Sequence, residues 1–221
     1  MTWDRTLRRS GARHGCLLPS SFAFLPYAAN VRELAGEARR AGRTVLLHMP
    51  MEPIGPADPG PGALMLNQSP AEQMARLDTA LGKFGALDGM NNHMGSRLTA
   101  DGDAMARVMA RLGGRGLFFL DSRTTADTRA EDAARQAGLA ALARDVFLDH
   151  DGTGAEASAQ LQRTLEIAAR TGLVIAIGHP HRLTLDALER FAAALDQDRF
   201  RLVGLAELVQ PATKEPFTAG R

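Results

Sequence analysis

Short apolar runs alternate along this chain with longer segments whose apolar residues recur at helical spacing. Seven runs have the length and composition of buried strands, at residues 21–25, 45–48, 86–90, 116–121, 144–149, 173–179 and 200–205. Six amphipathic segments lie between them, at residues 30–41, 69–83, 101–112, 125–137, 155–170 and 184–195. This alternation predicts an α/β fold with a mostly parallel sheet, and both a barrel and an open doubly wound sheet fit it.

Three of the predicted helices carry start signals in their first turn. Ser69 is followed by a proline and then by Glu72, which is the pattern of a capping box. Asn30 with Glu33 three residues later has the same spacing, and Thr184 is in position to cap the last helix.

Composition and charge narrow the class of protein. The net charge of +1 and the lack of a long basic run argue against a nucleic-acid partner. No apolar run is long enough to form a transmembrane segment, and Cys16, the single cysteine, cannot form an internal disulfide. The glycines form no nucleotide-binding fingerprint, and no serine lies in a nucleophile elbow.

The repeated pattern defines one predicted domain at residues 21–209. Residues 1–20 are basic and aperiodic, so we expect a disordered segment there and no core strand. Residues 210–221 form a polar tail. As written, the chain carries no export signal, so we expect either a cytoplasmic location or a natural start that differs from this one.

Five successive strands end in a side chain that can bind a metal or move a proton. In order, these are His48, His93, Asp121, Asp149 and His179. The carboxyl ends of parallel strands meet on one side of the fold, so we expect His48, His93 and His179 to converge there. Single Asp or His residues suit turns, but three of the chain's six histidines at such positions indicate a functional cluster.

The residue types suggest individual roles. With one carboxylate, His48 and His93 would form an open three-ligand site of the catalytic zinc kind. His179 precedes a proline and is suited to act as a general acid or base. His181 lies one loop residue further and is expected to be solvated.

Neighbouring polar residues have two interpretations. Glu52, Asn92 and Ser96 are candidates for orienting ligands or substrate. The run Asp121-Ser122-Arg123 fits an ion pair behind the ligands, and equally an Asp that caps the next helix beside an exposed Arg. Arg144 and Asp145 open a predicted strand, which would place them at the opposite end from the site.

Five motifs resemble, in order, those of the divergent polysaccharide deacetylase family. They are Leu47-His48-Met49-Pro50-Met51-Glu52-Pro53, Asn91-Asn92-His93-Met94-Gly95-Ser96-Arg97-Leu98-Thr99, Phe119-Leu120-Asp121-Ser122-Arg123-Thr124, Arg144-Asp145-Val146-Phe147-Leu148-Asp149 and Ile177-Gly178-His179-Pro180. The resemblance implies an irregular (β/α) barrel of about seven parallel strands, a divalent metal, usually zinc, and hydrolysis of acetyl groups on a glycan. It also implies a place in the bacterial envelope or periplasm.

The sequence departs from the family pattern at its start. That pattern opens with an apolar strand ending in paired aspartates, one of which binds the metal, and nothing before Ser21 matches it. We therefore expect a gap in the barrel wall, an unpaired strand edge and weak metal binding. Asp121 is then a candidate for the catalytic carboxylate.

Two function classes follow from these observations. The first is a metal-dependent deacetylase that acts on an acetylated glycan. The second is a non-catalytic descendant of the same barrel that binds a glycan or a protein, and the unmatched aspartates favour it. The sequence assigns neither the substrate nor the oligomeric state.

Overall fold

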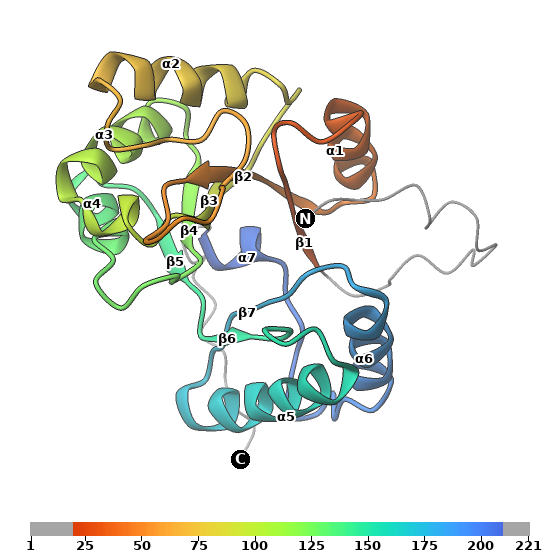
Figure 1. Cartoon of the computed structure of the whole chain (residues 1–221). Helices are drawn as coiled ribbons and strands as arrows, with labels where there is room; N and C mark the ends of the chain where they lie inside the picture. Colours follow the sequence, from red (N-terminus) through yellow and green to blue (C-terminus); the bar gives the residue numbers. More distant parts are fainter. Residues whose placement is uncertain (1–19, 210–221) are drawn as a thin grey trace.

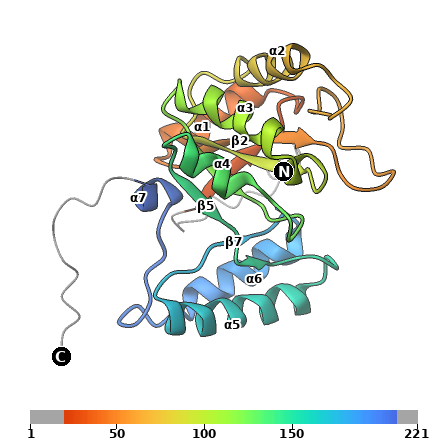
Figure 2. The same ribbon diagram turned by 90° about the vertical axis from the view of Figure 1, so that its left-hand side faces the viewer.

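A computed structural model of the chain describes residues 20–209. Residues 1–19 and 210–221, where an unstructured segment and a polar tail are predicted, lie outside the described residues. In Figures 1 and 2 the molecule has two parts that face each other, a larger sheet with helices α1 to α4 and a smaller strand pair with helices α5 and α6.

In the described residues, seven parallel strands form two sheets. The larger sheet has the order β1 (Ser21–Phe24), β2 (Thr44–Met51), β3 (Gly89–Met94), β4 (Phe118–Asp121) and β5 (Ala141–Ala143). The smaller sheet pairs β6 (Val146–Phe147) with β7 (Ala176–Ile177). The predicted α/β class with parallel strands is confirmed. Within residues 20–209 the strands form two sheets, with β1 at one edge of the larger sheet, which is consistent with the predicted irregular barrel that has a gap in its wall.

Helices cover the outer faces of both sheets. Those over the larger sheet are α1 (Val31–Arg40), α2 (Pro70–Leu81), α3 (Gly102–Gly113) and α4 (Ala130–Gln136), and those over the strand pair are α5 (Gly154–Thr171) and α6 (Arg182–Ala193). A single 3-10 turn, η2 (Leu98–Ala100), precedes α3, and α7 (Leu205–Val209) lies between the two parts. None of the helices in residues 20–209 has both the length and the apolar character needed to cross a membrane.

Two apolar layers hold the larger sheet. The outer layer lies between the sheet and its helices and contains Val45, Leu47 and Phe119. The inner layer joins Leu46, Phe118, Leu120 and Ile175, with Leu205 and Leu208 among the partly buried residues packed against it. The inner layer therefore connects the larger sheet to the β7 region and to α7.

Strand register decides which polar side chains share the inner face. His48 pairs with Asn91, and Asn91 pairs with Leu120 of the inner layer. Because side chains alternate along a strand, His48, Asn91 and His93 lie on the inner face. Asn92, which neighbours Asn91, faces the helices instead.

Several local predictions are corrected by the structure. The run 200–205 forms no strand, and its last residue begins α7. The run 144–149 contributes only the two residues of β6, and β5 lies before it. The capping box at Ser69 is confirmed, but Asn30 has φ 57° and makes no side-chain cap. Thr184 lies inside the first turn of α6, whose N-cap is His181.

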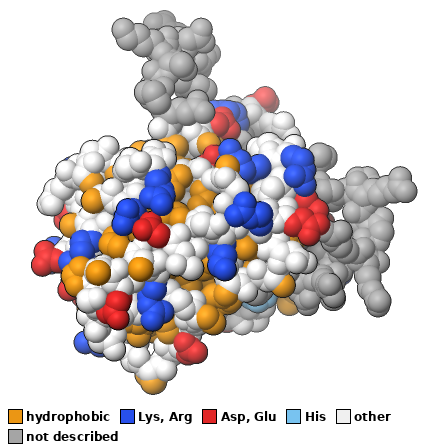
Figure 3. Space-filling model, turned by 90° about the horizontal axis from the view of Figure 1, so that it is seen from above, with side chains coloured by type: hydrophobic (Ala, Val, Ile, Leu, Met, Phe, Trp, Pro, Cys, Tyr) orange, Lys and Arg blue, Asp and Glu red, His pale blue; other side chains and the backbone are white. Residues whose placement is uncertain are grey.

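The surface over α2 carries both signs of charge. Figure 3 looks down on this face and shows basic and acidic side chains interspersed with apolar ones. Arg111 and Arg115 of the α3 region both approach Asp78 of α2, at 3.1 and 3.2 Å. These ion pairs are partly exposed, so each contributes little to stability.

Candidate active site at the carboxyl ends of the strands

Two histidines from neighbouring strands meet on the inner face. The Nε2 atom of His48 in β2 lies 3.2 Å from the Nδ1 atom of His93 in β3, and the ring centroids are 4.9 Å apart. Burial holds the pKa of His48 well below the ordinary imidazole value of 6.5 and lowers that of His93 to about 4. Both rings are therefore neutral at neutral pH, which is the form that binds a metal.

Asn91 fixes the orientation of His48. Its Oδ1 atom lies 3.0 Å from His48 Nδ1, and its Nδ2 donates to Ser122 Oγ at 3.1 Å. Since an amide oxygen only accepts, His48 carries its proton on Nδ1 and leaves the Nε2 lone pair directed toward His93. A polar partner behind a metal-binding histidine has this same effect on the ring.

The spacing of the two nitrogen atoms fits a shared metal ion. Two imidazole nitrogens that each lie ~2.0–2.1 Å from a tetrahedral zinc are about 3.3 Å apart. The observed separation of His48 Nε2 and His93 Nδ1 is 3.2 Å. The donor set, its tautomer and its spacing therefore suit zinc.

A buried carboxylate orients the third histidine. His179 follows β7, and its Nδ1 lies 3.1 Å from Asp149 Oδ1, while its backbone N–H donates to Asp149 Oδ2 at 2.7 Å. Thr184 Oγ1 also donates to Asp149 Oδ2, at 2.9 Å. The Asp149 side chain is 0% exposed and that of His179 is 39% exposed. The carboxylate thus lies behind the ring and leaves Nε2 as the accessible nitrogen.

The same region contains a group that could hold a metal ion. Ligand atoms of Asp149, His179 and His181 lie within 4.8 Å of one another. However, both Asp149 oxygens already accept hydrogen bonds from His179 or Thr184, and the carboxylate is shielded from solvent. This geometry suits an Asp–His pair that moves protons better than a metal centre.

His179 also acts electrostatically on the histidine pair. Burial is the largest cause of the low pKa of His48 and of His93, and the charge of His179 is one of the smaller causes. Its ring meets Phe147 edge to face, with centroids 5.4 Å apart and planes at 82°. The three histidines named from the sequence are therefore near enough to influence one another.

Asp121 is not beside the histidine pair. Asp121 directly follows Leu120, which pairs with Asn91, so Asp121 lies opposite Asn92. Like Asn92, it is on the helix-facing side of the sheet. Its Oδ1 accepts from Arg123 N and its Oδ2 from Thr128 Oγ1, both at 2.8 Å. These contacts fit an Asp that organises the turn before α4, and they do not support a catalytic role.

Asn92 and Ser122 join the ends of β3 and β4. Asn92 Oδ1 accepts from Ser122 N, and Ser122 Oγ donates to Asn92 O, both at 2.8 Å. Asn92 Nδ2 also donates to Met94 O at 2.7 Å. Asn92 therefore shapes the loop that carries His93, whereas Ser122 contacts the residue that orients His48.

Glu52 and Ser96 hold the loop after β2. Glu52 Oε1 accepts from Arg97 Nη1 at 2.8 Å, and its other oxygen accepts from Leu66 N. Ser96 Oγ accepts from Ile54 N at 2.7 Å. Both residues connect this loop to the motif around His93, so their visible role is to shape the rim of the site.

Arg123 reaches toward Glu131 on α4, whereas Arg144 lies closer to the site than predicted. Arg123 is exposed, has φ 46°, and its guanidinium lies 3.7 Å from Glu131. Arg144 donates from Nε to Ser122 O at 2.6 Å and from Nη2 to Arg123 O at 2.8 Å. The prediction that Arg144 lies at the opposite end is wrong, because it follows β5 instead of opening a longer strand.

Sequence reasoning missed the partners of two histidines. Asn91 stands two residues before His93, and this spacing places both on one face of a strand. Asp149 is one of the five strand-end residues, and its pairing with His179 joins two segments 30 residues apart. Only the position of Asn91, two residues before His93, is a signal that can be read locally in the sequence.

Comparison with known proteins gives one family. The sequence profile described as divergent polysaccharide deacetylase matches residues 16–209. An uncharacterized protein of Haemophilus influenzae is 38% identical over 188 residues, which make up 85% of this chain and 67% of that protein.

Two further relatives agree with this result. The uncharacterized protein YibQ of Escherichia coli is 36% identical over 178 residues, which cover 80% of this chain and 56% of YibQ. The crystal structure of an uncharacterized protein from Agrobacterium tumefaciens superposes with a TM-score of 0.82 at 27% identity, covering 87% of this chain and 80% of that one. The chain thus spans little more than half of one relative, and none of the three has an assigned activity.

Proposed function

Since this chain belongs to the divergent polysaccharide deacetylase family, we propose that it is a metal-dependent hydrolase acting on acetyl groups of an envelope glycan. The observation that carries the proposal is the His48–His93 pair, with nitrogens 3.2 Å apart, together with the Asp149–His179 pair, whose imidazole influences the first pair electrostatically. The first pair supplies metal ligands and the second supplies an oriented acid or base. Metal-assisted acyl hydrolysis uses both.

His48 Nε2 and His93 Nδ1 are the proposed ligands of a divalent metal, with zinc as the best fit to two imidazoles. When bound, zinc polarises an acetyl carbonyl and lowers the pKa of water to roughly 7. Asn91 keeps the His48 lone pair directed at the ligand position, through the contact at 3.0 Å.

His179 is the proposed acid for the leaving group. Asp149 Oδ1 accepts a hydrogen bond from the Nδ1–H group of His179, so Nε2 faces outward and can take up a proton or deliver one. In amide or ester hydrolysis this proton goes to the departing amine or alkoxide.

A second candidate function has its own supporting observation. Within residues 20–209, no carboxylate forms a group of three metal-binding side chains with His48 and His93. Two imidazoles alone leave a metal largely to water, and a weakly held metal favours a protein that binds a glycan without turning it over. Release of acetate distinguishes the deacetylase from the non-catalytic binding protein.

The test is acetate release from acetylated oligosaccharides after treatment with a chelator and again after addition of zinc. A deacetylase loses activity with the chelator and regains it with zinc, and His179→Gln lowers turnover at least tenfold without loss of metal, since positioned proton transfer contributes about 10²–10⁴-fold. A protein that binds these oligosaccharides but releases no acetate with zinc present is the non-catalytic descendant.

A further inference from the structure

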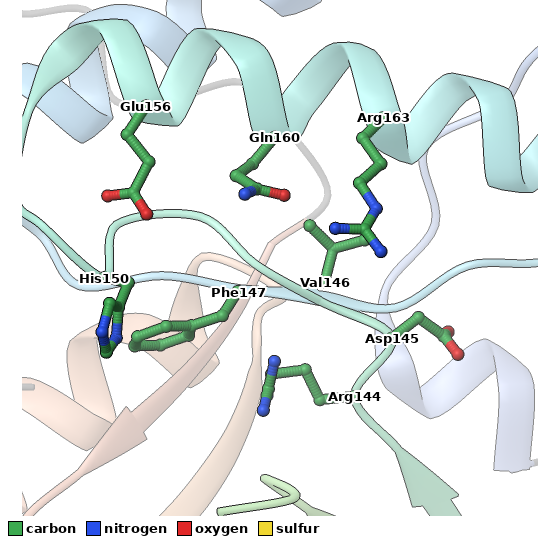
Figure 4. A pocket seen from close by; sticks show the side chains of 8 residues that line it. All are labelled: Arg144, Asp145, Val146, Phe147, His150, Glu156, Gln160 and Arg163. Atoms are coloured by element: carbon green, nitrogen blue, oxygen red, sulfur yellow. The ribbon is translucent and has the colours of Figure 1, made fainter.

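A groove separates α5 from the backbone around β6. Its volume is about 390 Å³, which lies in the range of small-molecule sites. Figure 4 shows Glu156, Gln160 and Arg163 pointing from α5 toward the backbone at Val146 and Phe147. Their spacing of four and three residues places all three on one face of the helix.

Two polar side chains of the groove have no partner in the part of the chain that the structure describes. The Gln160 amide and the Arg163 guanidinium make no hydrogen bond or ion pair with residues 20–209. Glu156 is held in place at the end of the groove, where its Oε2 accepts from Asp151 N. Gln160, like Glu156, is partly buried, whereas Arg163 is exposed at the edge of the groove.

The groove adjoins the proposed proton donor. Phe147 lines it, and the Phe147 ring also contacts the His179 ring with centroids 5.4 Å apart. Arg144, a second lining residue, places its guanidinium 5.2 Å from the Phe147 ring centroid. The Phe147 ring therefore separates a ligand in the groove from His179, the proposed proton donor.

We propose that this groove is a second sugar subsite, which binds the unit next to the one that carries the acetyl group. The inference rests on the proposed function for the position of the reacting unit. Guanidinium and amide donors alternate here with a carboxylate and an amide oxygen, and a sugar ring presents hydroxyls that both donate and accept. The two arginines of the lining are balanced by Glu156 and Asp145, so the groove has no strong preference for an anion.

The test compares N-acetylglucosamine oligomers of one, two and four units as binding probes, measured by calorimetry on the full chain. The variants are Gln160→Ala and Arg163→Ala. Loss of one or two hydrogen bonds should weaken tetramer binding about three- to tenfold in each groove variant, with monomer binding unchanged.

Each groove variant has a matched control on the same helix. Gln162→Ala alters an exposed glutamine on another face of α5. Arg170→Ala alters an exposed arginine two turns beyond Arg163, near the end of α5 and outside the lining of the groove. Both controls should bind the tetramer as the wild type does.

Two results would overturn the subsite. One is a wild-type protein that binds no oligomer, or binds all lengths equally. The other is a length preference that survives both groove variants or is lost equally in the controls. Acetate release, measured in the same samples, tests the proposed function separately. Length-dependent binding that the groove variants abolish, without acetate release, refutes deacetylation but retains the sugar subsite.

Discussion

Asn91 is the residue on which the orientation of His48 depends. Its side chain contacts His48 Nδ1 and Ser122 Oγ at 3.0 and 3.1 Å. Replacement by alanine frees the ring and removes a partner of Ser122. We expect Asn91→Ala to weaken zinc binding by about 10–100-fold.

A zinc titration with a competing chelator measures this effect. Ser96→Ala is the matched control, because Ser96 belongs to the same motif but contacts Ile54 N rather than a histidine. The control should bind zinc within about twofold of the wild type. Equal losses in both variants would mean that general loosening of the loop, and not the orientation of His48, sets the affinity.

The low pKa of His93 makes stability depend on pH. In the unfolded chain an imidazole takes up a proton near pH 6.5, whereas folded His93 does so only near pH 4. Between these values the unfolded state binds more protons, so stability falls as the pH is lowered from about 6.5 to about 4. His48, whose pKa is also lowered, adds to the same trend.

Urea unfolding of the metal-free protein at about pH 7 and about pH 5 measures this dependence. His93→Gln removes one titrating group, so the variant should lose less stability over the interval than the wild type. An identical loss in the two proteins would show that other groups dominate acid unfolding.

At single positions, the sequence predicted which residues follow the strands better than it predicted the face of the sheet on which each side chain lies. His48, His93 and His179 were named because each follows an apolar run, and that rule is local. Asp121 obeys the same rule, yet strand alternation puts it on the helix-facing side. One-residue differences in register decide the face of a side chain, and the register is fixed only when the strands pair.

The loop after β3 is held in a conformation that few residues adopt. Met94 has φ 52° and Gly95 has φ 91°, directly after His93. A Cβ on Gly95 would lie 2.8 Å from Met51 Cβ, whereas a Cβ on Gly116, which also has positive φ, would meet nothing within 4 Å. Gly95→Ala should therefore combine backbone strain with a clash.

We expect Gly95→Ala to lower the free energy of unfolding by about 2–5 kcal/mol and Gly116→Ala by only about 1–2 kcal/mol. Urea unfolding of both variants checks this difference. A Gly95→Ala loss no larger than that of Gly116→Ala would indicate that Met51 moves aside without cost.

The elements missed by the sequence prediction have physical reasons. β5 is Ala141-Leu142-Ala143, and alanine has low strand propensity, so nothing marks it before β4 provides a pairing edge. The run 200–205 is apolar because Leu205 packs against the inner layer as the start of α7, not because it forms a strand. The residues of this run are partly buried or exposed and form no strand, so the predicted buried strand is wrong on both counts.

Across the whole molecule, Arg144 connects the two halves of the site. It lies between β5 and β6, binds the carbonyls of Ser122 and Arg123 beyond β4, and contacts the Phe147 ring next to His179. Lysine cannot reproduce two fixed bonds and a planar stack. We expect Arg144→Lys to lower stability by about 1–3 kcal/mol and to lower acetate release as well.

Thermal or urea unfolding together with the acetate assay tests this connection. Arg135→Lys is a suitable control, since Arg135 forms only exposed ion pairs with Glu131 and Asp132 on α4. It should change neither quantity. Full stability and full turnover in Arg144→Lys would show that the two halves hold their relative position without this side chain.

Zinc stoichiometry in two variants tests the central claim most directly, because two groups of side chains compete for the metal. Equilibrium dialysis against zinc would be run on the wild type, His93→Ala and Asp149→Asn. If His48 and His93 hold the metal, the wild type takes up a single ion, His93→Ala loses it, and Asp149→Asn keeps it while acetate release falls. Zinc retained by His93→Ala and lost by Asp149→Asn would contradict the account and place the metal at the group of Asp149, His179 and His181.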